Sequence, residues 1–255
     1  MIGIIGPIAR ATVLEAVRSR MLWLVAAVLA LSLGVASFLH QVAIIESAQI
    51  QGAVVGALLR ACAAFLTVSF VVMSMVREFN DKVLELMLAQ PWPRAVYLFG
   101  KFVGFSTAAI VLALILSLPL LLFVPAARIP VWSLSLACEL VILTAMSLFF
   151  VITLTHIVPA LAGVLGFYVL ARSISALQII AAASESSVRW NDRAADWIVS
   201  GIAWVMPRFD QMTQTAWLVA APPTLPMIGS VIAQTAIYTL LLVAAAQFDL
   251  HRQNL

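Results

Sequence analysis

Charge is scarce in this 255-residue sequence, in which 10% of the residues are Asp, Glu, Lys or Arg and 64% are hydrophobic. Soluble domains carry about 25% charged residues, and a single soluble core could not keep so much apolar surface out of water. The sequence therefore predicts an integral membrane protein. Its net charge of +3 comes without a basic cluster beside aromatic residues, so nothing indicates nucleic-acid binding.

Cysteine and catalytic motifs are also scarce. Cys62 and Cys138 both lie in apolar runs, so neither a disulfide framework nor a cysteine metal site is predicted. The chain has no Walker-type glycine loop, and its apolar runs hold no paired carboxylates, His-x-x-x-His motif or Ser–His pair. We therefore expect no catalytic residue, bound cofactor or metal in this chain, and no enzymatic activity of its own.

Six apolar runs are long enough to cross a bilayer core of about 30 Å as helices. They predict an all-α polytopic membrane protein, a single transmembrane domain over residues 1–255, with spans at residues 22–39, 60–76, 102–124, 131–158, 160–183 and 227–248. The helix from Arg60 to Arg77 already covers about 26 Å. Residues 52–59 are therefore expected to form an exposed extension, with Arg60 at the outer boundary of the membrane.

The N-terminal residues 1–20 have an amphipathic pattern that predicts a helix lying in the membrane interface. Pro7 suits the start of that helix, because proline at the first helical position loses no needed hydrogen bond. A frayed cytosolic extension of the first span is the alternative. Lys and Arg are more numerous on the side that holds both termini, which predicts cytoplasmic termini; these residues are Arg10, Arg18, Arg20, Arg77, Lys82, Arg94, Lys101 and Arg252.

The longest polar region, residues 184–226, is predicted to be an extracytoplasmic loop. It contains Trp190, Trp197, Trp204 and Trp217, and tryptophan favours the membrane–water interface. We expect one or two short helices on or in the outer leaflet there. A seventh span is the alternative.

Residues 77–101, REFNDKVLELMLAQPWPRAVYLFGK, form the one strongly charged island between apolar runs. The spacing of the charged residues predicts a surface helix that ends before Pro91 and has its polar side toward the cytosol. The charged residues at this helical spacing are Glu78, Asp81, Lys82 and Glu85. A solvated connecting helix of no particular role would give the same pattern.

This stretch resembles the first cytoplasmic loop of type 2 ABC exporter permeases. The matching residues are Glu78, Leu84, Glu85, Leu86, Leu88, Pro91, Arg94, Gly100 and Lys101. Lys82 and Val83 stand where Gly-Thr is usual in the family. The segment ARATVLEAVRSRMLWL resembles the interfacial elbow helix of these permeases, residues 206–210 resemble the segment before their last span, and FDLHRQNL resembles their basic tail.

The resemblance implies a transmembrane permease subunit in a bacterial inner membrane, surrounded by lipid and paired with a second permease chain, identical or related. Two ATP-binding cassette subunits would bind ATP and Mg. The island would be the coupling helix, contacting an ATPase subunit through Arg77, Glu78, Asp81, Lys82, Glu85, Leu86, Gln90, Pro91 and Arg94. The chain is also similar to permeases grouped with multicopper-enzyme maturation, which implies a periplasmic partner. Alternatives are a membrane anchor that passes ATP-driven motion to such a partner, and an unrelated secondary transporter.

Ionisable residues inside spans usually face protein or a cavity. Glu139 is about 12 Å inside the fourth span and Arg172 about 16 Å from the outer end of the fifth, so we predict that they pair. The pair would hold two helices together or line a substrate path. His156 is interpreted as a hydrogen-bonded residue at a helix end, because a single histidine makes no metal site.

Overall fold

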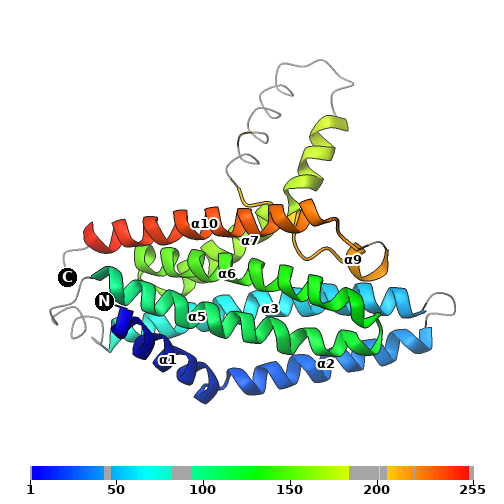
Figure 1. Ribbon diagram of the computed structural model, residues 1–255, viewed down its shortest axis with the longest axis horizontal. Coiled ribbons are helices and arrows are strands. Elements are labelled where there is room, and N and C mark those ends of the chain that lie inside the picture. Colours follow the sequence, from blue (N-terminus) through cyan, green and yellow to red (C-terminus); the bar gives the residue numbers. More distant parts are fainter. Residues whose placement is uncertain are drawn as a thin grey trace.

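The computed structural model describes residues 2–42, 47–81, 94–183, 201, 206–220 and 222–252, and over these residues it is helical with no strand (Figure 1). The long helices are α1 (Ile2–Arg18), α2 (Met21–Val42), α3 (Ser47–Asn80), α5 (Arg94–Ser117), α6 (Ile129–Leu154), α7 (Ile157–Ala183) and α10 (Leu225–Arg252). The short ones are η1 (Leu118–Leu122), η2 (Ala126–Arg128), η4 (Phe209–Gln211) and α9 (Ala216–Val219).

Within the described residues, six helices are long and apolar enough to cross a membrane: α2, α3, α5 with η1, α6, α7 and α10. This confirms the predicted multi-pass architecture. Helix α6 is the centre of the bundle, because 72% of its apolar window is buried against protein, compared with 17% in α2 and α10. It packs against α3, α5, α7 and α10, whereas most of the apolar window of α2 and of α10 is exposed on the chain.

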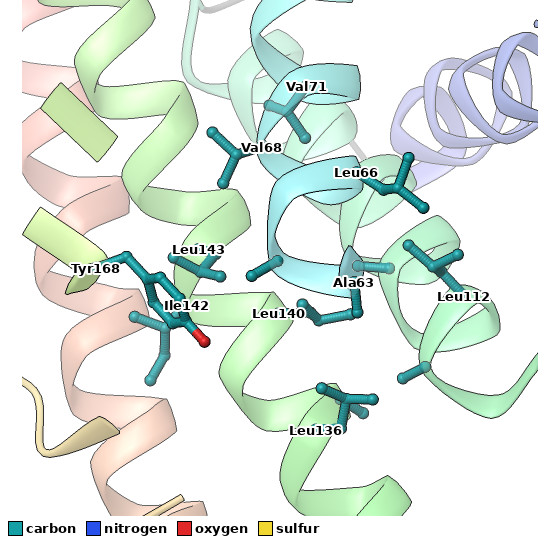
Figure 2. Close-up of a cluster of buried hydrophobic side chains, with 14 of the residues drawn as sticks. Ala63, Leu66, Val68, Val71, Leu112, Leu136, Leu140, Ile142, Leu143 and Tyr168 are labelled. Atoms are coloured by element: carbon teal, nitrogen blue, oxygen red, sulfur yellow. The ribbon is translucent and has the colours of Figure 1, made fainter. Parts of the chain in front are cut away.

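The core lies where α6 meets α3 and α5. Leu136 and Leu140 of α6 are fully buried beside Ala63 of α3, and Leu112 of α5 completes the contact (Figure 2). Lipid tails are as apolar as leucine, so helices in a bilayer associate by close packing, which small residues such as Ala63 permit. The apolar pattern thus determines which segments form spans, but shape complementarity determines how the spans pack against one another.

Helix α3 is longer than the predicted second span. It begins at Ser47, and Val55 and Leu59 are fully buried. A Cβ on Gly56 would lie 2.5 Å from Leu218 Cδ1, so the segment after residue 206 packs closely onto this part of α3. The prediction of an exposed extension at residues 52–59 is therefore wrong, because a distant part of the chain covers it.

Two other helix ends differ from the predictions. Helix α1 begins at Ile2, so Pro7 lies inside it and costs one backbone hydrogen bond. Helix α6 ends at Leu154, where Thr155 adopts a left-handed conformation (φ 56°) and donates its N–H to the carbonyl of Val151. Since α7 starts at Ile157, the fourth span ends at Leu154 rather than at the predicted residue 158.

Helix α1 packs against α5 through two glycines. A Cβ on Gly100 would lie 2.9 Å from Ile8 Cβ, and a Cβ on Gly104 would lie 2.7 Å from Thr12 Cβ and 2.9 Å from the carbonyl of Ala9. Thr12 is fully buried there. The N-terminal helix is therefore packed on the bundle, which disfavours the frayed extension.

We expect Gly104→Ala to lower the unfolding free energy by about 1–3 kcal/mol, because the added methyl group would push α1 away from α5. The matched control is Gly34→Ala in α2, where a Cβ would meet nothing within 4 Å. That change should be neutral or stabilise by about 0.5–1 kcal/mol through helix propensity. Thermal unfolding in detergent measures both. Equal stabilities for the two variants would contradict the close packing.

Candidate functional site

The last turn of α3 is joined to the start of α5 by three polar side chains, Glu78, Tyr97 and Lys101, which we call the inner clamp. Tyr97 Oη donates to Glu78 Oε2 at 2.5 Å, and Lys101 Nζ forms an ion pair with Glu78 Oε1. Lys101 and Tyr97 are each only 6% exposed. Lys101 Nζ also lies 5.6 Å from the ring centroid of Phe105. The clamp therefore fixes the two helix ends between which residues 82–93 run.

A second polar contact links α1 to the same region. Ser74 Oγ, on α3 one turn before Glu78, donates to Glu15 Oε1 at 2.8 Å. Together with the glycine contacts on α5, this bond makes α1, α3 and α5 one connected group at this end of the bundle. Both marked termini lie at the same end (Figure 1).

The predicted contact residues of the charged island are placed as follows. Glu78 was predicted to lie on a surface helix with its side chain open to the cytosol. This is corrected by the structure, in which Glu78 belongs to α3 and faces α5 in the inner clamp. Arg77 and Asp81 are exposed at the end of α3. Arg94 opens α5, and its side chain is outside the described part of the chain. Also outside it are Lys82, Glu85, Leu86, Gln90 and Pro91.

Deep in the bundle, the predicted pair of Glu139 and Arg172 is present. Arg172 Nη1 lies 3.1 Å from Glu139 Oε1, and Tyr168 Oη donates to the same oxygen at 2.7 Å. Glu139 is fully buried. A carboxylate in this position is tolerated only when it is paired, because removing an ion from water costs several kcal/mol.

The arginines of this region also bind the backbone of residues 206–220. Arg172 donates to the carbonyls of Phe209 at 2.7 Å and Met212 at 3.2 Å. Arg60 donates to the carbonyl of Thr213 at 2.9 Å, and the N–H of Thr213 donates to Ser135 Oγ at 2.8 Å. Non-helical backbone is tolerated at membrane depth only where protein satisfies its polar groups. Side chains from α3, α6 and α7 do so here.

Arg60 has partners that the sequence did not indicate. It shares the carbonyl of Thr213 with Arg172, which donates to it at 3.5 Å, so Arg60 belongs to the same polar cluster as Arg172 and Glu139. Sequence reasoning missed Tyr168 and Ser135. Each lies four residues before a charged member of the cluster on the same helix, and this i, i+4 spacing was the available signal.

His156 and Trp217 complete the predicted set. His156 is exposed in the turn after α6, with Nδ1 3.1 Å from the carbonyl of Leu154, as expected of a hydrogen-bonded helix-end residue. Trp217, in α9, is 5% exposed and packed within the protein. The other three tryptophans of the loop, Trp190, Trp197 and Trp204, are outside the described residues.

These features define a multi-pass helical membrane protein. A scan against protein-family models found no match for the chain, and a search of curated proteins found no similar sequence.

Proposed function

We propose that this chain is the transmembrane permease subunit of an ABC transporter, paired with a second permease chain and driven by two ATP-binding subunits. One observation carries the proposal. Three residues that the charged island shares with type 2 ABC exporter permeases, Glu78, Gly100 and Lys101, meet in space where α1, α3 and α5 converge. Gly100 admits α1, and Lys101 neutralises Glu78, so the pattern has a physical reason in this fold.

The inner clamp gives the coupling region a mechanical role. A subunit that pushed on residues 82–93 would move α3 and α5 together, because separating Glu78 from Lys101 would leave two largely buried charges unpaired. Helix α1 would follow through Glu15 and the glycine contacts. In this mechanism ATP and Mg are bound by the partner subunits, and this chain converts their closure into helix movement.

The proposal places both termini and the charged island in the cytoplasm of a bacterial cell. Its support is the bias of Lys and Arg toward that side of the chain. The exposed Arg77 and Asp81, beside the clamp, would then face the ATPase subunit.

A second candidate is a membrane anchor that passes ATP-driven motion to a periplasmic protein without conducting a solute. The observation that favours it is the packing of α6, whose fully buried leucines meet α3 and α5 directly (Figure 2). Residues 206–220, bonded to three spans, would be the element that moves at the outer face. An unrelated secondary transporter is the third alternative, and it requires no ATPase.

The proposal is tested by co-purification. The tagged chain is expected to retain an ATP-binding subunit encoded by a neighbouring gene. Arg77→Glu combined with Asp81→Lys should reduce the retained ATPase by roughly tenfold or more, since like charges facing each other at an interface cost several kcal/mol. The control is Arg208→Glu, an exposed reversal in the extracytoplasmic segment, which should leave retention unchanged.

Glu78 is unsuitable for this test, because its reversal would break the inner clamp as well as any contact with a partner. Transport by the purified chain without an ATPase would overturn both ABC-type candidates. Reconstitution of the complex in vesicles separates those two, because only the permease would move a solute or lipid.

A further inference from the structure

An apolar groove of about 80 Å³ runs between α1, α2 and α5. Its walls include Val17, Met21 and Val25 on one side and Ala108, Leu112 and Ile115 on the other. Val17 is 54% exposed, whereas Leu112 at the base is 3% exposed, so the groove opens to the surroundings of the bundle. From Ala108 to Ile115 it follows about 10 Å of α5.

Two arginines lie at the break between α1 and α2, next in sequence to the lining residues Val17 and Met21. Arg18 ends α1, and Arg20 precedes the first residue of α2. Both are exposed, and neither has an acidic partner among the described residues. Glu15, the nearest acid in sequence, is hydrogen-bonded to Ser74 instead. The break between α1 and α2, beside the groove in sequence, therefore carries two exposed positive charges.

We propose that the groove and Arg18 with Arg20 form a binding site for one anionic phospholipid. An acyl chain would lie between α1, α2 and α5, and the phosphate would accept charge-assisted hydrogen bonds from the guanidinium groups. The walls are apolar side chains in a chain that spans a bilayer, so a hydrocarbon tail is the occupant that fits them. The adjacent positive charges select an anionic headgroup over a zwitterionic one.

The arginines and the apolar groove are neighbours along the chain, as the headgroup and tail of one lipid would require. The arginines lie between the two parts of the lining, which extends from Val13 of α1 to Val25 of α2 and along α5 to Ile115. A lipid whose phosphate binds the arginines would direct its tail along the span toward the bilayer centre. Such a lipid would join α1 to α5, and its binding does not depend on any ATPase partner.

Native mass spectrometry of the detergent-purified chain tests the proposal, with dioleoyl phosphatidylglycerol and dioleoyl phosphatidylcholine as probes. We expect one phosphatidylglycerol to bind more tightly than phosphatidylcholine. Arg18→Gln with Arg20→Gln should weaken phosphatidylglycerol roughly 30-fold and remove the preference, at about fivefold for each arginine.

Val17→Trp should also weaken binding, because the indole would fill the groove. Leu14→Trp is the matched control: Leu14 is exposed on the same helix, 45% against 54% for Val17, and does not line the groove. Both positions are exposed, so neither variant is expected to unfold the chain. Equal binding of the two lipids, equal behaviour of the two Trp variants, or displacement of the lipid by soluble glycerol phosphate would each overturn the proposal.

Discussion

Replacing Glu139 by alanine is expected to lower the unfolding free energy by about 3–5 kcal/mol, the usual cost of breaking a buried ion pair by removing one partner. Arg172 would lose its carboxylate partner while it shares the Thr213 carbonyl with a second cation, Arg60, and the Tyr168 hydroxyl would lose its acceptor. Unfolding in mixed micelles with increasing SDS measures the effect.

The matched control is Thr144→Ala, also fully buried on α6. Thr144 Oγ1 bonds only the carbonyl of Leu140 in its own helix. Loss of this hydrogen bond should lower the unfolding free energy by about 1 kcal/mol. Glu139→Gln should be intermediate, because an amide oxygen can still accept from Tyr168 and Arg172 but carries no charge. If Glu139→Ala were as stable as Thr144→Ala, the cluster would not stabilise the fold.

The hydrogen bonds of the cluster also predict that exchanging the charges of Glu139 and Arg172 should not restore stability. Exchanging the charges, with Arg at 139 and Glu at 172, restores a formal ion pair. A carboxylate at position 172 cannot donate to the carbonyls of Phe209 and Met212, however. The double variant should therefore remain destabilised, and proteolysis within residues 206–220 should increase. Full recovery would show that pairing alone is what the fold requires.

Lys101→Met is expected to lower the unfolding free energy by about 3 kcal/mol, because it leaves the Glu78 carboxylate without its cation. Adding Glu78→Gln removes the unpaired charge. The double variant should then be more stable than the sum of the single effects predicts, by on the order of 1–3 kcal/mol. A double-mutant cycle of unfolding free energies measures this coupling.

Arg252→Met is the control for the aromatic contact alone. The guanidinium of Arg252 lies 5.6 Å from the ring centroid of Phe248, the same distance as Lys101 Nζ from Phe105, and Arg252 is exposed with no acidic partner among the described residues. An exposed cation–π contact contributes about 0.5–1 kcal/mol. If Lys101→Met cost no more than Arg252→Met, the inner clamp would contribute nothing, and the proposed coupling of α3 to α5 would lose its basis.

Some of the site was predictable because it depends on depth alone. Glu139 and Arg172 lie on neighbouring spans at similar distances from the membrane surface, and neither can remain unpaired in an apolar bundle. Position along a helix therefore sufficed to pair them. The partner of Arg60 was not predictable, because it is the backbone carbonyl of Thr213, far along the chain, and any residue type has a carbonyl.

The sequence by itself determined the class of protein and its six spans, since apolar length and charge content decide what can cross a bilayer. Only the tertiary structure decided where the ends of those helices lie and what their polar residues face. Val55, Gly56 and Leu59 are buried because residues 206–220 fold back over α3, and Glu78 faces Lys101 because α3 and α5 pack side by side there. Helical period gives the face of one helix, but which neighbour covers that face depends on close packing between segments distant in sequence.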